Sequence, residues 1–142
     1  MYTLKLTPEQ VANIQLAKMA TEQRADASSP EAVYELIKHY ANDEKESFIL
    51  LILDGANYIK DIQTVSVGTL TSSLVHPREV FRPAIEQAAA SIIVAHNHPS
   101  GNLYPSTADT QVTQRLQECG ELLGIALLDH LIITKESYKS IV

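Results

Sequence analysis

The sequence of 142 residues fits one domain with a single core; its formal net charge is -6 and it contains one cysteine. Hydrophobic residues make up 45% and charged residues 20%, the balance of a folded globular protein rather than a disordered or fibrous one. The acidic charge disfavours sequence-independent binding to nucleic-acid phosphates, and a single cysteine excludes an intramolecular disulfide framework and a four-cysteine zinc site.

The first 45 residues are predicted to form a helical extension. Thr7, Pro8 and Gln10 have the pattern of a helix start with a capping box, which predicts a helix over residues 7–23. Ser29 and Pro30 repeat that pattern for a helix reaching residue 40. The N-terminus lacks the features of a secretory signal, and no apolar run approaches the ~20 residues of a membrane span, so we expect a cytoplasmic protein.

Two strands are predicted after this extension. Residues 47–53 form a continuous apolar run of strand length, which is typical of a buried central strand. Residues 54–57 provide turn chemistry, and the β-branched residues of 58–67 predict a hairpin partner that ends or bulges at Gly68.

A helix and a buried strand follow in the sequence. The helix is predicted over residues 77–90, with Pro83 expected to kink it or to delay its regular start. Residues 91–95 form the next apolar strand, with His96 at its carboxyl end. Ligands of open α/β sheets bind at the carboxyl ends of strands, so this position makes His96 a candidate binding residue.

The last two predicted elements are an amphipathic helix over residues 106–123, stopped at Gly124, and a strand over 125–134. The apolar face of this helix is predicted to consist of Ala108, Val112, Leu116, Cys119 and Leu123. Strands interleaved with helices predict an α/β fold with a mixed β-sheet flanked by helices.

The segment from His96 to Asp109 has the composition of a metal site. His96 and His98 leave an extended backbone on the same side, and the turn that follows returns Asp109 in the first turn of the next helix. Two imidazoles and one carboxylate suit zinc (Zn2+), and three protein ligands leave a fourth position for water, as in a catalytic site. Zinc would lower the pKa of that water to ~7.

A structural role competes with this interpretation. Ser106 and Asp109 also form a capping box, which alone would explain both residues, and the two histidines alone would suit a turn. The occurrence of two histidines, a serine and an aspartate within one short segment favours metal binding. The two roles are compatible, because a metal ligand can lie in a capped first turn.

His96-Asn97-His98-Pro99 followed by Ser106 and Asp109 resembles the JAMM motif, His-x-His-Pro, six residues, Ser-x-x-Asp, of MPN-plus metalloprotease-like domains. The segment AHNHPSGNLYPSTAD is most similar to the RadC family, a bacterial branch of these domains that is named for DNA repair. The stretches GTLTSSLVHPREVFRPAI (68–85) and LLGIALLDHLIIT (122–134) extend the resemblance, which covers roughly residues 46–140. It implies an MPN/JAB, cytidine-deaminase-like domain over residues 46–142.

The resemblance also implies catalytic roles. A glutamate just before the first core strand would activate the zinc-bound water; Glu46 is the best match and Glu44 the alternative, since the sequence leaves the register open. Ser106 would donate a hydrogen bond to the developing oxyanion. Full-length RadC-like proteins carry an N-terminal helix-hairpin-helix module, and the first 45 residues lack its Gly-rich hairpin signature.

The leading hypothesis is therefore a JAMM-type zinc hydrolase that cuts an amide, peptide or isopeptide bond in a peptide or protein substrate. The alternative is a DNA-repair-associated accessory or scaffold domain that binds metal without peptidase activity. The tripeptide His96-Asn97-His98 does not support an HNH nuclease, because in those nucleases the three letters denote residues spread over a ββα-metal element. A zinc deaminase is excluded, because its Pro-Cys-x-x-Cys ligand pair is absent.

The other histidines and the cysteine are interpreted as structural. His76 precedes Pro77 and is interpreted as a helix cap, and His39 as a surface residue. His130 lies within a predicted strand and is interpreted as a core or edge histidine outside the metal site. Cys119 is expected to be a packing residue on an apolar helix face.

Overall fold

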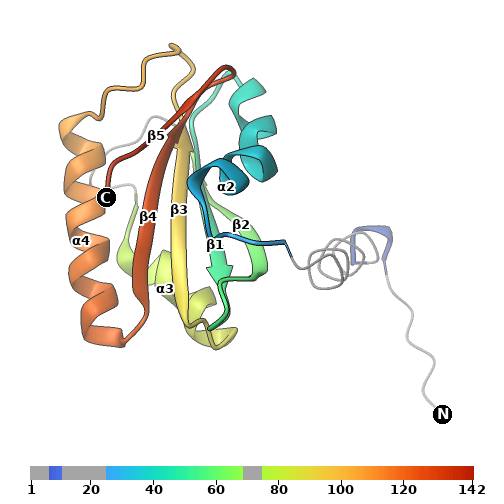
Figure 1. The fold of residues 1–142 in the computed structure, drawn as a ribbon, viewed down its shortest axis with the longest axis vertical. Coiled ribbons are helices and arrows are strands. Elements are labelled where there is room, and N and C mark those ends of the chain that lie inside the picture. The colour runs from blue at the N-terminus through green and yellow to red at the C-terminus, as the bar shows by residue number, and fades with distance from the viewer. Residues whose placement is uncertain (1–6, 11–24, 69–74) are drawn as a thin grey trace.

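The computed structural model describes residues 7–10, 25–68 and 75–142. At its centre lies a five-stranded sheet in the order β2-β1-β3-β4-β5 (Figure 1). The strands are β1 (Ser47–Leu53), β2 (Ile59–Val67), β3 (Ser91–Asn97), β4 (Ala126–Ile133) and β5 (Tyr138–Ser140). β3 and β4 run parallel, whereas the other neighbouring pairs run antiparallel. The predicted α/β class with a mixed sheet is confirmed.

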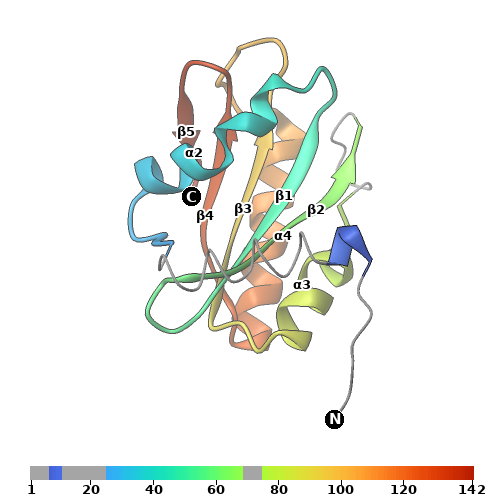
Figure 2. The ribbon, with the colours of Figure 1, turned by 90° about the vertical axis from the view of Figure 1, so that its right-hand side faces the viewer.

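Helices cover both faces of the sheet, which gives three layers (Figure 2). The helix α2 (Pro30–Ile37), continued by the 3-10 helix η1 (Lys38–Asn42), packs on one face, and α3 (Pro77–Glu86) and α4 (Thr107–Leu123) pack on the other. Within the described ranges, no helix is long and apolar enough to cross a membrane.

Alternation along the central strands divides the core between the two faces. Ile49, Leu51 and Leu53 of β1 face α2, while Phe48, Leu50 and Ile52 face α3 and α4. Every residue of β1 and β3 is buried, which explains why both strands read as continuous apolar runs. Val94 and His96 therefore share the face that is covered by α3 and α4.

Three predicted helix starts are confirmed. The Thr7 amide donates to Gln10 Oε1 (2.9 Å) and the Gln10 amide to Thr7 Oγ1 (3.1 Å), and Ser29 caps α2 through the Ala32 amide (3.2 Å). The remainder of the helix predicted over 7–23 lies outside the described residues. Ser106 caps α4, which ends at Gly124 with a left-handed φ of 71°.

Other predicted bounds are wrong in detail. The helix predicted over 77–90 ends at Glu86, because Ala88 adopts a left-handed φ of 53° and the chain turns so that the Ala90 amide bonds Leu53 O (2.9 Å). It begins at Pro77, so Pro83 does not delay its start. The strand predicted over 91–95 continues to Asn97, because β4 supplies partners as far as Ile133. The strand β5 was not predicted.

Gly120 fixes how closely α4 approaches the start of β4. A Cβ atom at this position would collide with the backbone carbonyl oxygen of Ile125, which cannot move as a flexible side chain would. We expect Gly120→Ala to lower the free energy of unfolding by about 1–2 kcal/mol, overpacking outweighing the gain in helix propensity. Urea unfolding checks this.

Gly55→Ala is the matched control, because a Cβ atom there meets nothing within 4 Å. It should unfold within about 0.5 kcal/mol of wild type. Equal stability of the two variants would contradict the close approach.

Candidate metal centre

The two histidines of the motif lie at the carboxyl end of β3 and on one face of the sheet. His96 is buried, with 1% of its side chain exposed, whereas His98 is 14% exposed. Their Nε2 atoms lie 2.9 Å apart. His98 Nδ1 lies 2.6 Å from the backbone oxygen of Asn102 in the loop that leads to α4. The open side of the pair is therefore the side of His98.

Asp109 reaches both histidines from the first turn of α4. Its Oδ1 lies 2.9 Å from His96 Nε2 and its Oδ2 lies 3.2 Å from His98 Nε2, with 1% of the side chain exposed. Asp109 Oδ2 also accepts the Ser106 amide (2.7 Å), and Ser106 Oγ accepts the Asp109 amide (3.1 Å). The same carboxylate thus completes the capping box and faces the imidazoles.

These contacts make a group that could hold a metal ion. One ligand atom each from His96, His98 and Asp109 lies within 4.8 Å of the others. A third histidine, His130, contacts the Nδ1 side of His96. The sequence-predicted ligands therefore come together as a cluster of three.

The cluster favours an ionised carboxylate. Burial by itself raises the pKa of Asp109, but hydrogen bonds from His96 and His98 outweigh it and hold that pKa far below its usual range. The hydrogen bond to Asp109 raises the pKa of His98, and the charge of Glu46 adds to this effect. Glu46 therefore lies close enough to the cluster to act on His98.

Sheet register explains the position of Glu46. Phe48 of β1 pairs with His96 of β3. Because the strands are antiparallel, two residues back from Phe48 and two residues forward from His96 bring Glu46 opposite His98. Strand alternation, extended back by one residue from β1, predicts the face of Phe48 for Glu46 as well. It is partly buried, whereas Glu44 is exposed. Register and the effect on the pKa of His98 together put Glu46 near His98.

Asn97 holds the segment that carries Glu46. Its side chain is fully buried on the face of β3 opposite the histidines. Its Oδ1 accepts the Ser47 amide (2.6 Å), and its Nδ2 donates to the carbonyls of Lys45 (3.0 Å) and Asp43 (3.4 Å). One amide side chain therefore fixes the backbone on both sides of Glu46.

Asn97 and the buried neighbours of His96 were not predicted from the sequence. His130 Nε2 lies 2.9 Å from His96 Nδ1, and His130 Nδ1 lies 2.6 Å from Thr113 Oγ1. Even spacing places His130 and Ile132 on one face of β4, but the sequence alone does not show that β4 lies next to β3. His130 is buried, as a core histidine would be.

The remaining structural interpretations have mixed outcomes. His76 occupies the N-cap position of α3, but in the described part of the chain its side chain makes no capping hydrogen bond. His39 is exposed and lies against Tyr40. Cys119 packs against the core and is partly exposed. Leu123 is 48% exposed, so the predicted apolar face of α4 does not bury it.

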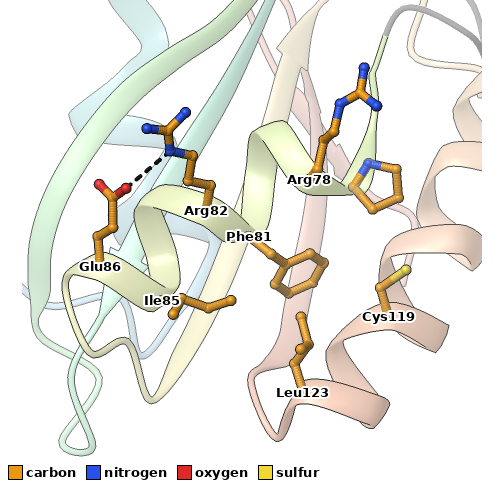
Figure 3. A pocket seen from close by; sticks show the side chains of 8 residues that line it. Arg78, Phe81, Arg82, Ile85, Glu86, Cys119 and Leu123 are labelled. Atoms are coloured by element: carbon orange, nitrogen blue, oxygen red, sulfur yellow. Dashed lines mark hydrogen bonds and ion pairs between the residues drawn. The ribbon is translucent and has the colours of Figure 1, made fainter.

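A separate groove of about 450 Å³ lies between α3 and α4 (Figure 3). Phe81 and Leu123 face each other across it, and Arg82 on its outer side pairs with Glu86 (3.0 Å). Its lining residues include none of the three candidate ligands. We therefore place the candidate site at the histidines rather than in this groove.

Comparison with known proteins identifies the family of this domain. The model of the RadC-like JAB domain family matches residues 27–142. The chain belongs to the RadC-like JAB domain family. Similar proteins are UPF0758 proteins from Symbiobacterium thermophilum (45% identical over 125 residues, 87% of this chain and 53% of that protein) and Rubrobacter xylanophilus (50% over 107 residues, 75% and 47%). The chain spans about half the length of the curated relatives that it matches.

The dual role of Asp109 predicts a loss of stability that does not depend on metal. With a chelator present, Asp109→Ala should lower the free energy of unfolding by about 1–3 kcal/mol, because the Ser106 amide, the buried His96 and the partly buried His98 lose an acceptor. Asp109→Asn keeps an acceptor oxygen and should lose less. Urea unfolding of the two variants measures the difference, and wild-type stability of Asp109→Ala would refute this role.

Proposed function

We propose that this RadC-like JAB domain is a zinc-dependent hydrolase of amide bonds, peptide or isopeptide, in a peptide or protein substrate. The supporting observation is the convergence of two imidazole nitrogens and a buried carboxylate, with Glu46 just before the neighbouring strand β1 and acting on His98. All residues assigned to the reaction lie between positions 46 and 109, within the proposed catalytic unit of residues 46–142.

The distances in the cluster fit zinc. Tetrahedral zinc with bonds of about 2.0–2.1 Å needs ligand atoms about 3.3 Å apart. His96 Nε2 lies 2.9 Å from both His98 Nε2 and Asp109 Oδ1, and His98 Nε2 lies 3.2 Å from Asp109 Oδ2. These separations lie close to that value, one to each oxygen of the carboxylate, and the nitrogen and oxygen donors are those that zinc accepts in catalytic sites.

A zinc ion held by His96, His98 and Asp109 would supply a Lewis acid that polarises the scissile carbonyl and makes water more acidic. Glu46 is assigned as the general base, which takes the proton of the attacking water and delivers it to the leaving nitrogen. Ser106 is assigned as the oxyanion donor; its oxygen accepts the Asp109 amide, so its own proton is the one it would donate.

The exposure of the cluster indicates how a substrate would approach. The side chains of His96 and Asp109 are buried, whereas His98, Glu46 and Ser106 are at least partly exposed to solvent. A scissile bond would therefore enter over His98, between Glu46 just before β1 and the first turn of α4. The names of these relatives specify no substrate, so the proposal stops at the amide class.

Metal analysis tests the first step. The purified protein should bind about one zinc per chain, and a His96→Ala/His98→Ala double variant should bind none, because it retains a single carboxylate ligand. His39→Ala is the matched control, since His39 is exposed on η1. Zinc retained by the double variant would contradict the assigned ligands.

Substitution of the base tests the reaction itself. Glu46→Gln should reduce turnover of a peptide or isopeptide substrate by about 10²–10⁴-fold and leave zinc content unchanged, since the amide cannot accept the proton. Glu44→Gln, on an exposed side chain two residues away, should keep wild-type turnover. If Glu44→Gln is inactive and Glu46→Gln is active, the base is Glu44. Stoichiometric zinc without any turnover would favour the accessory function.

A further inference from the structure

His130 is a buried imidazole for which the proposed reaction has no use. It lies on β4 with no exposed surface, and its partners His96 and Thr113 are 1% and 5% exposed. Its Nε2 lies 2.9 Å from His96 Nδ1, and its Nδ1 lies 2.6 Å from Thr113 Oγ1. Thr113 Oγ1 in turn lies 2.9 Å from the backbone oxygen of Asp109. The chain of contacts therefore starts at one proposed ligand and ends at another.

The two proposed histidine ligands are held differently on the side away from the cluster. His98 Nδ1 faces the carbonyl oxygen of Asn102, which can only accept a hydrogen bond. With a metal ion bound, this contact would keep the proton of neutral His98 on Nδ1 and leave Nε2 bare for the ion. His96 Nδ1 faces an imidazole nitrogen, which either donates or accepts. The tautomer of His96 therefore depends on His130.

Counting protons along the chain leaves one arrangement in which His96 can bind a metal. The nitrogen of His96 that faces the cluster is Nε2, so Nε2 must be bare and Nδ1 must carry the proton. His130 Nε2 must then accept, so the proton of neutral His130 lies on Nδ1 and is donated to Thr113 Oγ1. The Thr113 hydroxyl has one proton, which must go to Asp109 O.

The reverse arrangement disables the ligand. If Thr113 donated to His130 Nδ1, the proton of neutral His130 would lie on Nε2 and be donated to His96 Nδ1. The proton of His96 would then lie on Nε2 and point at Asp109. Both arrangements require a neutral His130, and its complete burial favours the uncharged ring.

We propose that His130 and Thr113 are positioning residues that fix the tautomer of His96, so that its Nε2 is free to bind the metal ion. The acceptor at the end of the chain decides the arrangement, because a backbone carbonyl cannot donate back to Thr113. The inference rests on the proposed function only in taking His96 as a metal ligand; it does not require hydrolysis.

Zinc affinity of the full chain provides the test. Thr113→Val has nearly the same shape but removes the hydroxyl, so His130 Nδ1 loses its acceptor and the competing tautomer gains. We expect the zinc dissociation constant, measured by competition with a chromophoric chelator, to rise about 10–100-fold, the usual effect of losing the partner of a ligand histidine. Thr113→Ser restores the hydroxyl and should bind within a few-fold of wild type.

Thr110→Val is the matched control on the same helix. Thr110 Oγ1 makes the same kind of bond to a carbonyl four residues earlier, Ser106 O (2.8 Å), but it is exposed and lies outside the His130 chain. Its zinc affinity should equal that of wild type. Wild-type affinity in Thr113→Val, or equal losses in Thr113→Val and Thr110→Val, would overturn the inference.

A second measurement on the wild-type protein avoids any question of folding. Nitrogen-15 spectra of the imidazole rings in the zinc-loaded chain should show His130 protonated at Nδ1 and bare at Nε2. A proton on His130 Nε2 would overturn the inference. Failure of the proposed function has a different signature, since zinc would then bind with this tautomer and no substrate would be cut.

Discussion

The antiparallel pairing of β1 with β3 is the constraint on which the candidate site depends. Only this pairing, with Phe48 opposite His96, brings Glu46 beside His98 across fifty residues of sequence. A shift of one residue would turn Glu46 to the opposite face. Asn97 extends the pairing beyond the last ladder contact, because its side chain binds the backbone of Ser47 and Lys45. The register and the position of the base are thus one property of the sheet.

Burial gives the polar cluster its organisation. An unpaired polar group in the interior costs about 1–3 kcal/mol, and in the described ranges every buried side-chain nitrogen and oxygen has a hydrogen-bond partner. Single side chains meet this requirement by binding several partners. Asp109 contacts the Ser106 amide and two imidazoles, and Thr113 contacts a carbonyl of its own helix and His130. Metal binding, helix capping and core polarity are therefore coupled in this domain.

Much of this arrangement can be predicted from the sequence, for reasons that concern local chemistry. Continuous apolar runs identify β1 and β3, and Ser106 with Gly124 marks both ends of α4. The ligand set is likewise local, since two strand residues and one helix turn supply it. Asn97, Thr113 and His130 could not be assigned, because their partners come from other elements whose order in the sheet no local pattern specifies. The end of α3 depends on the left-handed Ala88, which carries no glycine signal.

Direct observation of the coordination shell tests the central claim. X-ray absorption at the zinc edge of the loaded protein should show only nitrogen and oxygen neighbours at about 2.0–2.1 Å, with the outer-shell scattering of two imidazoles. A sulfur neighbour at about 2.3 Å would place the ion on Cys119, and a shell without imidazole scattering would place it away from His96 and His98. Either result would contradict the account.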